Sequence, residues 1–133
     1  MPHLVFEITD NIAAQADIPA LLKKANACLI AQNGVFPIGG IRARAIVLEH
    51  YRVADGAGVD DGGDAFVHVT LKVGAGRTAE VLKKTGDELF AMVKDHFAAL
   101  YAARGLALSM EINEFNEAGT WKQNNIHARY KKV

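Results

Sequence analysis

The first residue that could do chemistry is Pro2, which directly follows the start methionine. A small second residue favours removal of Met1, which would leave Pro2 with a free secondary amine. Such a nitrogen is not part of a peptide bond and can accept a proton as a general base. The apolar run Leu4-Val5-Phe6 predicts a buried strand that would hold this amine in a dry pocket. The alternative is that Pro2 only starts an edge strand, where its missing N–H needs no partner.

Arginines supply the second kind of chemistry. Arg42 and Arg44 are two residues apart near the start of a predicted strand, so they share one face of it. They are either solvated or paired with carboxylates, or they form an anion site. Arg77 stands in a glycine-rich turn, Gly74-Ala75-Gly76-Arg77-Thr78, between a strand and a helix. Either the turn meets a purely geometric need, or its backbone N–H groups and the Arg77 guanidinium bind a carboxylate.

Other chemistries find less support. The turn lacks the third glycine of a dinucleotide-binding motif, because Ala79 stands there. His3, His68 and His127 have no metal-ligand spacing, and no Ser-His-Asp constellation is obvious, so we expect neither metal nor cofactor. The loop 55–64 lacks the closing glutamate of a calcium loop and is interpreted as a surface excursion.

The elements that must position these residues follow from periodicity and capping signals. Strands are predicted over about 2–8, 41–53, 66–73 and 106–115. Asp17 is expected to cap a helix that ends at Asn33-Gly34, and Thr78 a single long helix that closes at Arg104-Gly105. The apolar face of the long helix is predicted to contain Leu82, Leu89, Phe90, Val93, Phe97, Leu100 and Tyr101.

The order of these elements predicts a single α/β (α+β) domain over 1–133 with an internal repeat. Each copy, about 2–53 and about 66–115, reads strand, helix, strand, and a tail of about 116–133 follows. Each crossover should place two parallel strands in one sheet, giving four strands with both helices on one face. The other face would be left bare, and an apolar bare face implies burial against other subunits.

The amino-acid composition limits the classes of partner molecule that we expect for this protein. The chain has 133 residues, half of them hydrophobic, with fifteen basic and fifteen acidic residues. This balance indicates neither nucleic acid nor an anionic membrane as a partner, and no apolar run approaches a membrane span. Cys28, the only cysteine in the sequence, cannot form an internal disulfide, so a cytoplasmic location is the default expectation. It is interpreted as a small core residue.

Several motifs resemble one family nearly end to end. They are Pro2-His3, Phe36-Pro37, Gly40-Ile41-Arg42-Ala43-Arg44, Phe66 to Arg77, His96 to Leu100, and Lys122 to Ala128. On these residues the chain resembles the 5-carboxymethyl-2-hydroxymuconate delta-isomerases of the tautomerase superfamily. The resemblance implies a homotrimer of β-α-β pairs that uses no cofactor or metal, with Pro2 as general base and Arg42 and Arg77 binding substrate.

The resemblance further implies a reaction. The dienol 5-carboxymethyl-2-hydroxymuconate, a polycarboxylate, would be converted into its 2-oxo-ene tricarboxylate during homoprotocatechuate (4-hydroxyphenylacetate) degradation. Two alternatives stay open. One is a broader enol–keto tautomerase acting on phenylpyruvate-like compounds, and the other is a non-catalytic trimeric binding domain in which Pro2 only starts a strand.

Overall fold

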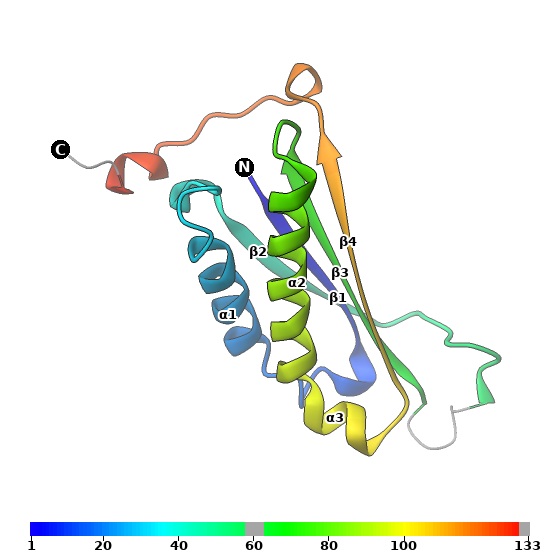
Figure 1. Cartoon of the computed structure of the whole chain (residues 1–133). Helices are drawn as coiled ribbons and strands as arrows, with labels where there is room; N and C mark the ends of the chain where they lie inside the picture. Colours follow the sequence, from blue (N-terminus) through cyan, green and yellow to red (C-terminus); the bar gives the residue numbers. More distant parts are fainter. Residues whose placement is uncertain (58–62, 131–133) are drawn as a thin grey trace.

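Four strands form one mixed sheet in the computed structural model, which describes residues 1–57 and 63–130. The strands are β1 (His3–Thr9), β2 (Arg42–Leu48), β3 (Ala65–Gly74) and β4 (Leu106–Phe115), in the spatial order β2-β1-β3-β4. The strands within each repeat are parallel, β1 with β2 and β3 with β4, whereas β1 and β3 are antiparallel. The predicted sheet of two parallel pairs is confirmed (Figure 1).

The helices cover one face of this sheet (Figure 1). They are α1 (Ile18–Ile30), α2 (Ala79–His96) and the short α3 (Ala98–Ala103). The predicted caps are confirmed: the Asp17 side chain accepts a hydrogen bond from the Ala20 N–H at 3.4 Å, and the Thr78 hydroxyl accepts one from the Val81 N–H at 3.2 Å. Each satisfies a backbone donor that the first helical turn leaves unpaired.

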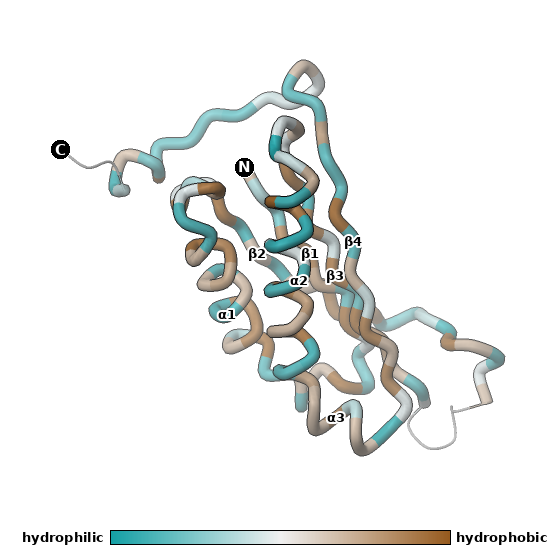
Figure 2. The backbone as a smooth tube through the Cα atoms, viewed as in Figure 1, coloured by the Kyte–Doolittle hydropathy of each residue, from teal (hydrophilic) through white to brown (hydrophobic). Residues whose placement is uncertain are grey.

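The core lies between the helices and the sheet. Alternate residues of β1 and β3 point into it, as the period of a strand requires. Figure 2 shows apolar residues recurring along the strands and helices, whereas the tail after β4 is mostly hydrophilic. The largest fully buried side chains are Phe6, Phe36, Phe97, Leu4, Ile8, Ile12, Leu21, Leu29, Leu71, Leu89, Val67 and Val69.

Two predicted elements have the wrong extent. The strand expected over 41–53 ends at Leu48, because its neighbour β1 ends at Thr9, which pairs with Leu48, and offers no backbone beyond it. The single long helix is broken at Phe97, whose backbone leaves helical geometry (φ −97°, ψ 11°). Phe97 stays in the core at 1% exposed, but Tyr101, predicted on the buried face, is 62% exposed.

The sheet face opposite the helices carries many polar side chains, whereas the expectation that it is buried against other subunits required an apolar face. Strand alternation and register place on it His3, Val5, Glu7, Arg44, Ile46, Phe66, His68, Thr70, Lys72, Ser109 and Glu111. Apolarity of this face therefore does not by itself require a partner subunit. The loop predicted over 55–64 lies partly outside the described residues, which omit 58–62.

Candidate active site

The candidate site lies at one edge of the sheet, where β1 and β2 begin and β3 and β4 end. Parallel pairing within each repeat, with antiparallel pairing between β1 and β3, brings these four strand ends together. The tail leaves β4 here, passes through the short 3₁₀ helix Glu117–Gly119, and runs over this edge to a second one, Ile126–Tyr130 (Figure 1).

Pro2 is buried at the start of β1. Its carbonyl accepts a hydrogen bond from the Arg42 backbone N–H at 3.1 Å, which ties the start of β1 to the start of β2. Met1 precedes it, and the Met1 sulfur accepts from Arg42 Nη1 at 3.1 Å and from Asn124 Nδ2 at 3.4 Å. The first two residues are thus held between β2 and the tail.

The tail is docked on a glycine pair. Asn124 Nδ2 donates to the Gly39 carbonyl at 2.8 Å, within the 3₁₀ helix Ile38–Gly40. A Cβ on Gly39 would lie only 2.8 Å from both the backbone N and the Cα of His127. Glycine at position 39 therefore permits the close approach that brings the tail over the chain start.

A cavity of about 320 Å³ opens at this edge. It contains two cationic side chains, Arg42 and Lys122, beside an aromatic wall. Its lining comprises Met1, His3, Arg42, Phe115, Thr120, Trp121, Lys122 and Gln123. A pocket of this kind, apolar with a few fixed cations, suits a small organic anion.

Arg77 stands outside that lining, in the turn before α2. Its Nη1 donates to the Gly74 carbonyl at 3.1 Å and its Nη2 to the Val35 carbonyl at 3.0 Å. The guanidinium also lies 4.7 Å from the centre of the Phe36 ring. These contacts hold the Arg77 charge in a fixed place, as a cation–π contact and two backbone acceptors should. Of the predicted site residues, Pro2 and Arg42 thus meet directly, whereas Arg77 is linked to the chain start only by the effect of its charge on the Met1 amine.

The electrostatic environment favours neutral bases at this edge. Burial lowers the pKa of the Met1 amine below its ordinary value, and Lys122, Arg77 and, more weakly, Arg42 lower it further. Glu117 opposes them. Burial also lowers the pKa of His3, as do several neighbouring cations, first among them Arg44. A proton on either group would be an additional positive charge among existing ones, which explains both shifts.

Sequence reasoning missed the part played by Lys122. The stretch Lys122-Gln123-Asn124-Asn125 contributed to the family resemblance, but no role followed from it. Lys122 lines the cavity, and its Nζ pairs with Glu117 Oε2 at 3.4 Å. After burial, it has the largest effect on the pKa of the Met1 amine, which it lowers. The sequence signal that could have pointed to Lys122 was this polar run in the tail. The position of the run in the fold depends on the contact between Asn124 and Gly39.

A hydrogen-bonded array on the open face was also not predicted. His68 Nδ1 lies 2.6 Å from Ser109 Oγ, and His68 Nε2 lies 2.7 Å from Glu111 Oε1. No serine–histidine–carboxylate constellation is obvious in the sequence, because its members are on two different strands. Strand register brings them together: His68 pairs with Ser109, and Glu111 is two residues further along β4. Ser109 and Glu111 are exposed.

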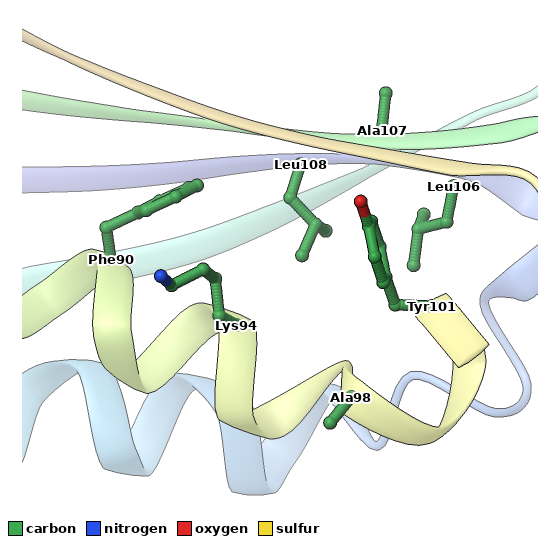
Figure 3. Close-up of a pocket in the computed structure, with 7 residues that line it drawn as sticks. All are labelled: Phe90, Lys94, Ala98, Tyr101, Leu106, Ala107 and Leu108. Atoms are coloured by element: carbon green, nitrogen blue, oxygen red, sulfur yellow. The ribbon is translucent and has the colours of Figure 1, made fainter.

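A larger cavity, of about 510 Å³, lies between α2, α3 and the edge strand β4 (Figure 3). Phe90 and Tyr101 reach toward Leu106 and Leu108 there, with Lys94 alongside. None of the predicted site residues lines it. Size alone does not make it the candidate site, because the convergent cations and the chain start lie at the other cavity.

Within residues 1–57 and 63–130, no cluster of three or more His, Cys, Asp or Glu side chains is arranged to hold a metal ion. In the same ranges, no helix has both the length and the apolarity that a bilayer crossing requires.

The chain shares its fold with tautomerase-fold proteins of low sequence identity. A symmetric trimer of a fused 4-OT matches it with a TM-score of 0.63 at 16% identity, over 91% of this chain and 93% of that one. A macrophage migration inhibitory factor-like protein from Entamoeba histolytica matches with a TM-score of 0.60 at 11% identity, over 92% and 95%. At such identities the likeness concerns the fold alone.

Sequence comparison is more specific. The family model for 5-carboxymethyl-2-hydroxymuconate isomerase matches residues 2–130. The 5-carboxymethyl-2-hydroxymuconate Delta-isomerase of Escherichia coli is 46% identical over 98% of this chain and 100% of its own length. A crystal structure of a 5-carboxymethyl-2-hydroxymuconate isomerase from Deinococcus radiodurans R1 has a TM-score of 0.92 and 58% identity, over 98% and 95%. The chain belongs to this isomerase family, as its motifs indicated.

Proposed function

We propose that this protein converts 5-carboxymethyl-2-hydroxymuconate into its 2-oxo-ene isomer by moving a proton through the amine of Pro2. The observation that carries the proposal is the cavity at the start of β1, where Arg42 and Lys122 stand beside the chain start. The substrate is a polycarboxylate, so fixed cations next to a base suit it. Membership of the isomerase family supports the same reaction.

The reaction needs a base that returns its proton to the same molecule. Once Met1 is removed, the Pro2 amine takes the proton of the 2-hydroxyl group of the dienol. The electron pair released forms the 2-oxo group, and the conjugated double bonds shift by one position. The Pro2 ammonium then delivers the proton to a carbon of the former diene, so atoms and charge balance and the amine is regenerated.

Positive charge near the substrate stabilises the intermediate that links these two proton transfers. The intermediate dienolate spreads negative charge toward the 2-oxo end, and preorganised cations stabilise charge that develops in a water-poor site. Arg42 and Lys122 line the cavity, and the Arg77 charge is held nearby by backbone acceptors. The same cations disfavour a protonated Pro2, so the amine is available as a base near neutral pH.

An ultraviolet assay with the authentic dienol tests this function. We expect enzyme-dependent loss of the dienol absorbance, and much slower turnover of the enol of phenylpyruvate, which offers one carboxylate to the cations. Equal kcat/KM for both compounds would favour a broader enol–keto tautomerase. If neither compound is turned over, the remaining interpretation is a non-catalytic binding domain.

The dependence of kcat/KM on pH should report the Pro2 amine. We expect kcat/KM to rise with pH through one group that must lose a proton, with a midpoint below that of an ordinary secondary amine. The reason is that burial and the cations around the chain start lower the pKa of an amine there, as they do for Met1. Titration of the ¹⁵N signal of Pro2 should give the kinetic midpoint.

Titration of His3 is the alternative explanation for this rise of kcat/KM with pH. The ordinary pKa of His3 is near 6.5 and is lowered in the fold, first by burial and then by Arg44. The variant His3→Gln should keep the rise in kcat/KM. If the rise disappears in that variant while the Pro2 nitrogen titrates at another pH, Pro2 is not the base.

We also propose that the protein is a homotrimer. Support comes from the fold, which it shares with a fused 4-OT whose structure is described as a symmetric trimer. The edge strands β2 and β4 each leave one side of the sheet unpaired, and β2 carries the exposed side chains Ile46 and Val47. Sedimentation equilibrium should give about three chains per particle, and an active monomer would contradict the proposal.

A further inference from the structure

A second cavity adjoins the site cavity on the open face of the sheet. This second cavity has a volume of about 260 Å³ and is lined by His3, Arg44, Lys72, Phe115 and Thr120. His3, Phe115 and Thr120 also line the cavity beside Met1. Because three residues line both, the two cavities adjoin, and together they are called the cleft.

Strand register explains why cations gather along this cleft. His3 on β1 pairs with Arg42 on β2 and with Lys72 on β3, so the three lie in one row across the sheet. Arg44 pairs with Val5 in the next row on the same face, and its Nη1 lies 3.1 Å from His3 Nδ1. The cleft thus has one cationic end at Arg42 and Lys122 and another at Arg44 and Lys72.

Carboxylates do not neutralise the second end within the described part of the chain. Its cavity is lined by no Asp or Glu, and none of the ion pairs in residues 1–57 and 63–130 involves Arg44 or Lys72. The whole chain has no net charge, so this concentration of positive charge is local. Like charges held close together repel, and a bound anion would relieve that repulsion.

His3 adds a neutral donor to the same place. Arginine can only donate, so His3 Nδ1 accepts the hydrogen bond from Arg44. A neutral imidazole with an accepting Nδ1 carries its hydrogen on Nε2. That N–H is a further donor for a carboxylate, next to two cationic side chains.

We propose that Arg44 and Lys72, with His3, form a second carboxylate subsite, which binds the substrate carboxylate farthest from Pro2 and selects polycarboxylates. This subsite rests on the proposed function, because it assigns a place to one more carboxylate of the same substrate. Arg42 and Lys122 bind at the end where the proton moves, and the second subsite fixes the far end. Positioning a molecule at two separated points lowers the entropy still to be lost in the reaction.

Calorimetry with non-reacting probes tests the subsite directly. The probes are propane-1,2,3-tricarboxylate, which has a carboxylate at each end of its chain and one between them, and butyrate, which has a single carboxylate. For Lys72→Met and for Arg44→Met we expect Kd for the tricarboxylate to rise about 3- to 10-fold, a modest factor because both side chains are exposed. Kd for butyrate should change less than about twofold, because its one carboxylate binds at Arg42 and Lys122. The variants should therefore lose part of the discrimination between the tricarboxylate and the monocarboxylate.

Two further variants serve as controls. Lys23→Met removes an exposed lysine from α1, away from the cleft, and should leave both Kd values unchanged. Lys72→Arg keeps the charge and should keep the affinity for the tricarboxylate, which excludes general damage to the fold. An unchanged tricarboxylate Kd in both methionine variants would overturn the subsite, and so would equal losses for the two probes.

The outcome for the subsite is separable from the outcome for the reaction. Binding of the probes needs no turnover. A wild-type protein that discriminates the two probes but does not convert the dienol would refute the proposed function and leave the subsite. Normal conversion of the dienol, with unaltered probe binding in Lys72→Met and Arg44→Met, would refute the subsite alone.

Discussion

Protein that begins at Pro2 should be at least about 100-fold more active, in kcat, than protein that keeps Met1. In the Met1 form the Pro2 nitrogen is an amide, which cannot take a proton, and general-base catalysis contributes about 10²- to 10⁴-fold. The Met1 residue would also occupy the cavity that it lines, close to Arg42. Two preparations of the wild-type sequence, with N-termini verified by mass spectrometry, allow the comparison in the dienol assay.

A matched variant separates the loss of the base from the obstruction of the cavity. Pro2→Ala, with Met1 removed, keeps an N-terminal amine in an open cavity and should be more active than the Met1 form of the wild type. Modification of the Pro2 amine with an alkylating reagent should abolish turnover by the processed wild-type protein. Full activity of a preparation that retains Met1 would show that another residue is the base.

Loss of either arginine should reduce kcat/KM for the dienol by about 10- to 150-fold, the range of one charge-assisted hydrogen bond. For Arg42→Ala the reason is direct, because Arg42 lines the cavity. For Arg77→Ala the reason is the loss of a fixed charge that acts on the chain start. Lysine should rescue each only in part, since it lacks the planar fork of arginine.

Arg77 needs a measurement of stability as well. Arg77→Ala also removes two hydrogen bonds to backbone carbonyls and the contact with Phe36, so its Tm should fall more than that of Arg42→Ala. Activity should therefore be compared at a temperature where both variants are folded. Arg52→Ala, in the loop after β2, is the control and should keep wild-type kcat/KM. An alanine variant of Arg42 or Arg77 with wild-type kcat/KM would remove that arginine from the site.

Local signals predicted much of the fold. The strand predicted over 106–115 is β4 with the same bounds, and Asp17 and Thr78 cap the helices as expected. Alternation of side chains and hydrogen bonds at a helix start involve residues close in sequence, so the sequence carries them. The end of β2 depends instead on where its neighbour β1 stops, and only the structure shows that the helix breaks at Phe97, which is buried while Tyr101 is exposed.

The site residues likewise fall into those that the sequence predicted and those that only the tertiary structure revealed. Pro2 and Arg42 were predicted from their residue types and the family motifs, and the parallel register of β1 and β2 places them together. Lys122 was missed as a site residue, because its position depends on a contact between Asn124 and Gly39, 85 residues apart in the chain. Periodicity carries no information about a contact of that kind.

The sequence by itself determined the repeated strand–helix–strand order and the family, and it led to the prediction that Pro2 becomes a free amine. The tertiary structure alone decided which charges act together. Arg42, His3 and Lys72 form one row only because three strands pair in a particular register, and the tail adds Lys122 only because glycine at position 39 leaves room for His127. Charges interact through space rather than along the chain, so their grouping follows from pairing and docking.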